Sequence, residues 1–184
     1  MTNKGKIFEQ NFAKCARDQG LFAYRIKDQY IPVQKGMQYG RVGLNPCDYF
    51  IMSPHKGGGY LFALELKSTQ YRQISIQKDP ELDDSAMIKY HQIQSLINLS
   101  QEANVVAGFI FNYRLDDDEY TYFMRIEDFS NWFAQSDKKS INRLDITMCG
   151  GIRISNTKKR VHYNYDVAEL INSVAEKERS SVNV

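Results

Sequence analysis

The chain has 184 residues, and its 24 lysine and arginine residues nearly balance its 22 acidic residues, which leaves a formal net charge of +2. This length suits one domain with a sizeable core, and 42% hydrophobic and 25% charged residues are ordinary for a globular protein. No apolar run approaches the length of a membrane span, and the polar first residues do not match a signal peptide. Three isolated cysteines without CxxC spacing argue against a zinc site and indicate a reducing cytoplasm.

The first half of the chain predicts a helix followed by three strands. The helix, over about 4–19, carries an apolar face that includes Phe8 and Phe12. The strands are expected at 21–27, 48–52 and 60–67. A long segment over 28–45 separates the first two strands, and three consecutive glycines at 57–59 favour a turn between the second and third.

The second half alternates helices and strands. A helix is expected over about 84–103, with Asp84 and Ser85 at its start, and another over about 127–136. Strands at 105–113 and 120–125 are joined by an acidic turn, and a short strand or two and a helix near 166–178 follow. This order predicts an α/β domain over 1–184, with one mixed sheet flanked by helices and a flexible tail from about 179 to 184.

The third strand carries the most informative pair of residues. Its residues 60–64 are apolar on both faces, as expected for a central strand. Glu65 and Lys67 then point to the same face, because side chains alternate along a strand. Burying both charges is costly unless they pair or bind something, and a divalent cation with a phosphate ester would satisfy both. The alternative is a surface ion pair on an edge strand.

A second acidic residue is predicted to lie beside this pair. Pro46 suits the entry of a strand, so Asp48 opens the strand at 48–52. A hairpin between this strand and the next would bring Asp48 beside Glu65. The alternative is that Asp48 only shapes a turn. Cys47 has no neighbouring histidine or basic residue to activate it and is expected to be a small buried side chain.

Two further polar residues complete a motif. Glu9 ends the sequence Gly-Lys-Ile-Phe-Glu at the edge of the apolar stripe of the first helix, and Gln92 follows His91 near the start of the second helix. The order Gly-Lys-x-Phe-Glu, Pro-x-Asp, Glu-x-Lys and His-Gln resembles the RecU family of Holliday junction resolvases, within the PD-(D/E)xK nucleases. It is also similar to the archaeal junction resolvases. The resemblance covers about the first two-thirds of the chain.

This resemblance implies a restriction-endonuclease-like core and a Mg²⁺-dependent endodeoxyribonuclease, with Mn²⁺ as a substitute ion. Asp48 and Glu65 would be the main metal ligands, and Glu9 would hold a second ion or its water shell. Lys67 would orient the attacking water, and Gln92 would hydrogen-bond that water or the flanking phosphate. A homodimer would make paired nicks in four-way DNA junctions during recombination and repair, as a bacterial protein or a phage protein in the host cytoplasm.

The segment over 28–45 occupies the place of a protruding stalk in RecU. It has several glycines, two tyrosines and few core-forming residues, which is typical of a functional or disordered loop. By resemblance, Lys35 and Arg41 would contact phosphate at the junction centre, and Tyr30 or Tyr39 could stack on an open base. The alternative is a flexible surface loop with incidental charges.

Charge is unevenly distributed along the chain. Basic residues concentrate in 1–41 and 138–160, whereas acidic residues concentrate at 79–84 and 116–119. This pattern suits a phosphate-binding face with a repelling rim, although solvated loops would also explain each cluster. The residues expected to bind DNA are Lys6, Arg25, Lys27, Lys35 and Arg41. Two other functions fit the residues: a restriction- or repair-type PD-(D/E)xK endonuclease on duplex or flap DNA, and a non-catalytic DNA-binding module.

Overall fold

The computed structural model describes residues 4–27, 30–31, 40–41, 45–54, 59–81, 85–115, 118–160 and 162–182. The helices are α1 (Lys4–Asp18), α2 (Tyr90–Ser100), α3 (Ile126–Gln135), α4 (Arg143–Met148) and α5 (Val167–Val182). The strands are β1 (Phe22–Arg25), β2 (Tyr30–Ile31), β3 (Gly40–Arg41), β4 (Tyr49–Met52), β5 (Leu61–Thr69), β6 (Gln73–Ser75), β7 (Val105–Leu115), β8 (Asp118–Arg125), β9 (Ser140–Asn142), β10 (Ile152–Ile154), β11 (Asn156–Lys158) and β12 (Tyr163–Tyr165).

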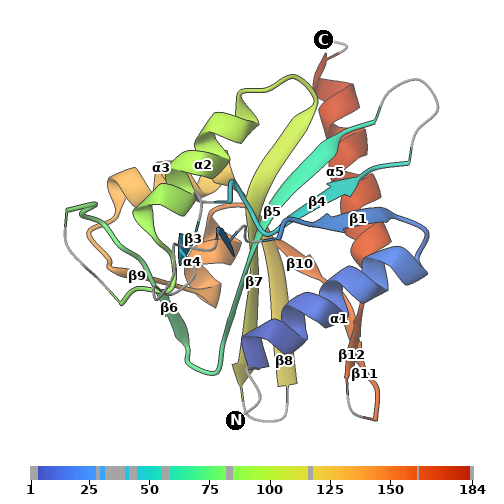
Figure 1. Cartoon of the computed structure of the whole chain (residues 1–184), viewed down its shortest axis with the longest axis horizontal. Coiled ribbons are helices and arrows are strands. Elements are labelled where there is room, and N and C mark those ends of the chain that lie inside the picture. The colour runs from blue at the N-terminus through green and yellow to red at the C-terminus, as the bar shows by residue number, and fades with distance from the viewer. Residues whose placement is uncertain are drawn as a thin grey trace.

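Six strands form the central sheet, in the order β1-β4-β5-β7-β8-β10 (Figure 1). Only β5 and β7 pair in parallel, and the other neighbours are antiparallel. The predicted mixed sheet is therefore confirmed, and β5 lies inside it between β4 and β7. Gly108 of β7 permits the close approach of β8, because a Cβ there would lie 2.4 Å from the carbonyl oxygen of Met124.

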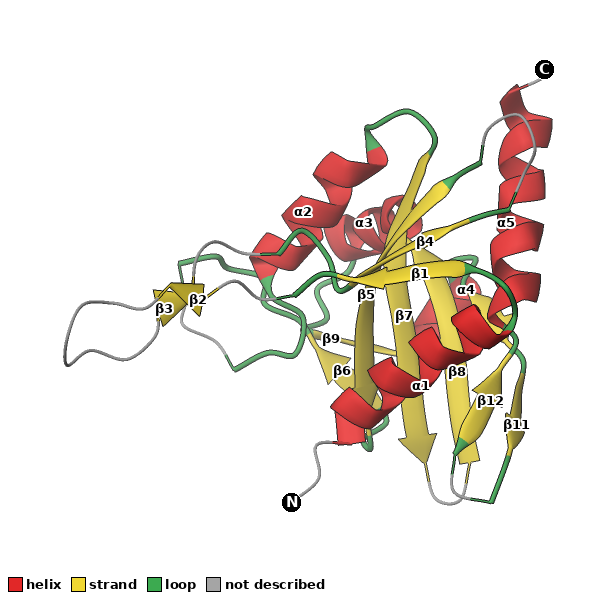
Figure 2. Cartoon of the chain, turned by 45° about the vertical axis from the view of Figure 1, so that its right-hand side comes forward, coloured by secondary structure: helices red, strands yellow, loops and turns green. Residues whose placement is uncertain are grey.

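Helices cover both faces of the sheet, as Figure 2 shows. One core packs α1 and α5 against the sheet, and the other packs α2 and α3 against the opposite face. Leu64 and Leu66 of β5 belong to the α1 and α5 core, whereas Ala63 belongs to the α2 and α3 core. Since side chains alternate along a strand, Glu65 and Lys67 face the α2 and α3 side.

The end of α1 shows how local sequence fixes the entry to the sheet. Gly20 has a φ of 81°, in the left-handed region that favours glycine. Its N–H donates to the Arg17 carbonyl at 3.0 Å, and the Leu21 N–H donates to the Ala16 carbonyl at 3.0 Å. These two bonds form a Schellman motif, which ends the helix and turns the chain into β1.

The prediction of a helix over 84–103 placed the start of the helix too early in the sequence. Residues 85–89 are not helical, and α2 begins at Tyr90. Ile88 instead forms a parallel bridge with Ile76, and its N–H donates to the Ser75 carbonyl at 3.0 Å. Both isoleucines are buried, so tertiary pairing of β-branched residues overrides the local helix signal. The strand β6 and its pairing with β9 were not expected either.

The segment between β1 and β4 contains a small antiparallel ribbon. β2 pairs with β3 through Tyr30↔Arg41 and Ile31↔Gly40, and Figure 2 shows this ribbon standing away from the central sheet. The predicted protrusion between the first two strands of the sheet is therefore present. Lys35 and Tyr39 lie outside the described residues, as do the side chains of Tyr30 and Arg41.

The C-terminal region is more regular than its sequence indicates. α5 extends to Val182, so residues 179–182, which were expected in a flexible tail, are helical. Residues 183–184 lie outside the described part of the chain. Among the described helices, none is long and apolar enough to cross a membrane.

Candidate active site

The predicted pair on β5 forms a close, buried contact. Lys67 Nζ lies 2.9 Å from Glu65 Oε1, and the two side chains are 12% and 5% exposed. They point to the same face, as the strand period predicts. Because β5 lies between β4 and β7, the alternative of a surface ion pair on an edge strand is wrong.

Asp48 lies directly before β4 and fixes the neighbouring strand. The Leu66 N–H donates to Asp48 Oδ2 at 2.8 Å, and the Asp48 N–H donates to the Leu64 carbonyl at 3.1 Å. Extending the register Tyr49↔Leu64 by one residue places Asp48 opposite Glu65. The predicted hairpin is confirmed, and the Asp48 carboxylate serves the β5 backbone rather than a local turn.

Gln92 links α2 to this pair. It is the third residue of α2, and its side-chain oxygen accepts a hydrogen bond from the Lys89 N–H at 3.0 Å. Its Nε2 donates to Glu65 Oε1. One amide therefore caps the helix with its oxygen and holds the Glu65 carboxylate with its nitrogen.

Glu9 approaches the site from α1, on the other side of the sheet. Arg25 Nη2 lies 3.8 Å from Glu9 Oε2. Partial burial raises the pKa of Glu9, and the negative charge of Asp48 raises it further, while Arg25 and Lys67 oppose the shift. The Asp48 charge therefore acts on Glu9, and Glu9 forms its ion pair with Arg25.

Three carboxylates repel one another at this site. Burial is the main cause that raises the pKa of Glu65 to about 7, and the charges of Asp48 and Glu9 add to it. The Lys67 ammonium opposes this shift but does not cancel it. A cation beside Asp48 and Glu65 would relieve both the repulsion and the loss of hydration.

The donor chemistry fits magnesium better than zinc. Mg²⁺ is usually bound by one or two carboxylates together with waters and substrate phosphate, which Asp48 and Glu65 would provide. In the part of the chain that the structure describes, no three acidic, histidine or cysteine side chains stand close enough to form a complete cation cage. Burial and the nearby Glu65 and Asp48 charges raise the pKa of Cys47 to about 12, so it stays a buried thiol, as predicted.

The residues expected to bind DNA are only partly described. Lys6, Arg25 and Lys27 are exposed, and the charge of Lys6 acts on Glu9 from the preceding turn of α1. The side chain of Arg41 and the whole of Lys35 lie outside the described residues. Their roles stay predictions.

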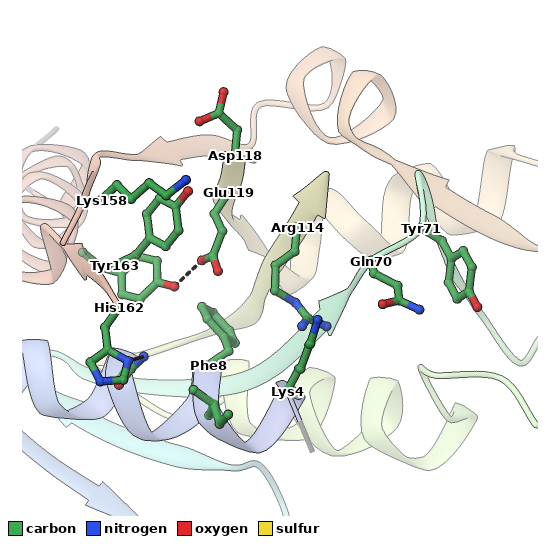
Figure 3. A pocket seen from close by; sticks show the side chains of 13 residues that line it. Lys4, Phe8, Gln70, Tyr71, Arg114, Asp118, Glu119, Lys158, His162 and Tyr163 are labelled. Atoms are coloured by element: carbon green, nitrogen blue, oxygen red, sulfur yellow. Dashed lines mark hydrogen bonds between the residues drawn. The ribbon is translucent and has the colours of Figure 1, made fainter. Parts of the chain in front are cut away.

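Sequence reasoning missed a hollow region beyond the end of β5. Two cavities of about 680 Å³ and about 800 Å³ lie there, and the described residues that line them do not include Asp48, Glu65 or Lys67. Figure 3 shows the first. The run Gln70-Tyr71-Arg72, directly after a strand that carries the predicted site, is the sequence signal that would have pointed to it.

The fold belongs to a known class. The structure is similar to that of Hjc, a Holliday junction resolvase from the archaeal hyperthermophile Archaeoglobus fulgidus, with a TM-score of 0.51 and 14% sequence identity. The match covers 91% of this chain and 99% of that chain. A central sheet of six strands flanked by helices in this arrangement defines a resolvase-like, restriction-endonuclease-like fold.

A relative from Bacillus subtilis shows the family to which the chain belongs. The chain is 33% identical over 190 residues to the SPbeta prophage-derived uncharacterized protein YotM of Bacillus subtilis (strain 168), an alignment that covers 97% of this chain and 90% of that protein. The chain belongs to the family of YotM. No protein-family model matches the sequence.

Proposed function

We propose that this chain is a metal-dependent DNA endonuclease that resolves four-way junctions. The observation that carries the proposal is the buried Glu65 carboxylate, held between Lys67 and Gln92 and set opposite Asp48. Lys67 offsets only part of the cost of burying Glu65, whose pKa stays raised to about 7, so the arrangement favours a site that binds a cation and a phosphate over a passive surface. The likeness to Hjc supports the fold on which this site stands.

The residues have separate tasks in this proposal. Asp48 and Glu65 would hold Mg²⁺, or Mn²⁺ in its place, which would polarise the scissile phosphate and lower the pKa of a bound water. Lys67 would orient the attacking water and stabilise negative charge that develops on the phosphoryl oxygens. Gln92 would keep Glu65 in one orientation. Glu9 would act on a second ion or its water shell.

The proposal of a four-way junction as the substrate rests on the shape of the protein and not on the residues of the candidate active site. A junction needs two cuts related by a two-fold axis, so the proposal includes a homodimer with one site in each subunit. The ribbon of β2 and β3 stands away from the sheet, where it would enter the open centre of a junction (Figure 2). As in the sequence-based prediction, a bacterial or phage protein acting in the cytoplasm fits this role.

Cleavage of matched four-way junction, flap and duplex DNA with Mg²⁺ or Mn²⁺ tests the proposal. Wild-type protein should cut the junction in symmetric pairs and run as a dimer in solution, and Lys67→Ala should bind the junction without cutting it. Preferred cutting of duplex or flap DNA would favour a restriction- or repair-type enzyme. DNA binding with no cleavage under any condition would show that the chain is a binding module.

A further inference from the structure

Two cavities adjoin each other beyond the end of β5. They share Gln70, Tyr71 and Asp118 as lining residues. The first also contacts the start of α1 and the β11–β12 hairpin, and the second contacts β9 and α4. We call the two cavities together the distal groove. Its lining residues Gln70 and Tyr71 directly follow β5, the strand that carries Glu65 and Lys67.

Four cations of the distal groove make no ion pair within the described part of the chain. Lys4 and Arg114 line the first cavity, where their side chains extend toward each other in Figure 3, and Arg72 and Arg143 line the second. Among the described residues, none of these four makes an ion pair with a carboxylate. The cations that line the groove, which also include Lys158, outnumber its two acids, Asp118 and Glu119, and this excess of positive charge favours the binding of an anion with several negative groups.

Other interactions orient some of these cations and neutralise little of their charge. Arg114 Nε donates to Ser68 Oγ at 3.0 Å, and the Arg143 guanidinium lies 4.0 Å from the ring centroid of Tyr120. Glu119, an acid in the first cavity, already accepts hydrogen bonds from Asn112 Nδ2 and from the Tyr165 hydroxyl. These two neutral donors orient the Glu119 carboxylate but leave it charged, and Glu119 lies opposite Arg114 across the β7–β8 pair.

An exposed aromatic ring stands where the two cavities meet. The Tyr71 side chain is 69% exposed. The backbone N–H of this residue donates a hydrogen bond to Thr69 Oγ1. Within the described chain its ring has no stacking partner and its hydroxyl no hydrogen bond. A ring between two pairs of cations matches the needs of a single nucleic-acid strand, in which phosphates bind the cations and a base stacks on the ring.

The position of Tyr71 relates it to the candidate active site. It lies four residues after Lys67, so at most about 13 Å of chain separates them at 3.3 Å per residue, because the chain bends at residues 70–72 after the end of β5. A strand whose phosphate lies at Lys67 would therefore reach the distal groove within a few nucleotides. A base in a duplex would present its edge rather than its face to Tyr71, so the ring favours an unpaired strand.

We propose that the distal groove binds an unpaired DNA strand that leads away from the scissile phosphate. Lys4 and Arg114 contact phosphates on one side of Tyr71, Arg72 and Arg143 contact them on the other side, and a base stacks on Tyr71. The direction of the strand rests on the proposed nuclease function. The binding itself does not, because it is measurable without cleavage.

Fluorescence anisotropy in EDTA, where no hydrolysis competes, tests this binding. The probes are a labelled fork with unpaired arms and a blunt duplex of equal length. Tyr71→Ala should weaken fork binding about tenfold, because stacking on an aromatic ring contributes strongly for each base. Tyr71→Phe keeps the ring and should bind like wild type. Both variants change an exposed side chain, so circular dichroism should show an unchanged fold.

The double variant Arg72→Ala, Arg143→Ala tests the phosphate contacts. The slope of log affinity against log salt for the fork should become shallower by about 1.4, because two phosphate contacts on a single strand are removed. Lys14→Ala with Arg17→Ala is the matched control. It removes two charges at the exposed far end of α1, about 15 Å or more along the helix from Lys4, and should leave the slope unchanged.

The outcomes separate this inference from the proposed function. Equal losses on fork and duplex would overturn the unpaired strand and make the groove a duplex surface. No loss on either probe would overturn the groove as a DNA site, even if the wild type cleaves junctions. Selective loss on the fork in a protein that never cleaves would support the groove and refute the nuclease.

Discussion

Gln92 Nε2 donates to Glu65 Oε1 across the interface between α2 and the central sheet. The same side chain accepts the Lys89 N–H and so caps the helix that carries it. Because Lys67 Nζ lies 2.9 Å from the same Glu65 oxygen, this atom has two donors and a fixed direction. The start of α2 thus sets the orientation of the carboxylate that we propose as a metal ligand.

Changing Gln92 to glutamate should separate the capping of α2 from the hydrogen bond to Glu65. Glutamate at the third helical position keeps the capping bond to Lys89 but removes a hydrogen bond to a charged group, so α2 should stay folded and the free energy of unfolding should fall by no more than about 3 kcal/mol. Glu65 would lose a donor and face a like charge, so kcat for junction cleavage should fall about 10- to 100-fold. Urea unfolding and single-turnover cleavage measure the two effects. Parallel losses of both would show that Gln92 serves only the fold.

Asp48 permits a similar separation of charge from hydrogen bonding. Asp48→Asn keeps an oxygen that can accept the Leu66 N–H, so the variant should stay folded but lose Mg²⁺-dependent cleavage. Asp48→Ala should also destabilise the protein by about 2 kcal/mol, because a buried N–H loses a charged acceptor. Thermal melts and cleavage assays test the pair. Full activity in Asp48→Asn would remove this residue from the metal site.

The raised pKa of Glu65 predicts how stability depends on pH in metal-free protein. Its pKa is about 7 in the folded state and near 4.5 when unfolded, so between these values the folded state holds more protons. Stability should therefore fall as pH rises from about 4.5 to about 7, by on the order of 1 kcal/mol per pH unit. Other groups titrate in this range, so the control is Glu65→Gln, which should flatten this part of the profile.

The same shift predicts the pH dependence of metal binding. A carboxyl that is protonated below its raised pKa must lose that proton before it binds Mg²⁺, so affinity should increase as pH rises toward 7 and then level off. Isothermal titration with Mg²⁺ over pH 5–8 measures this directly. A flat profile, matched by the Glu65→Gln variant, would show that the ion binds elsewhere.

The periodicity of the sequence predicts the positions of Asp48 and Glu65 well, and it predicts the tertiary contacts around them poorly. The apolar run before Glu65 and the hairpin from Pro46 to Lys67 are local signals, and they place Asp48 beside Glu65 correctly. The contact between Glu9 and Arg25 joins two elements through tertiary packing, and no local pattern encodes it. For the same reason the helix signal over residues 85–89 was misleading, because the tertiary bridge between Ile76 and Ile88 prevents a helix there.

The distal groove was missed for a related reason. It is assembled from α1, the end of β5, β7 and α4, so its cations are scattered through the sequence. The basic cluster at 138–160 includes Arg143 and Lys158, but their shared surface depends on how the β7–β8 hairpin packs. Charge counting alone would have treated them as separate loops.

The segment between β1 and β4 gives the last prediction, which separates junction recognition from general DNA binding. Replacing residues 34–41 with a short Gly-Ser bridge removes β3 and so dissolves the ribbon, while the strands of the central sheet stay intact. Duplex affinity and its salt slope should change little, because Lys6, Arg25 and Lys27 lie outside the segment. Junction cleavage should fall steeply, and Lys35→Ala with Arg41→Ala should give a milder selective loss. Electrophoretic binding and cleavage assays on both DNAs compare these effects. Equal losses on duplex and junction would make the segment a general phosphate clamp, and no loss on either would make it a passive connection.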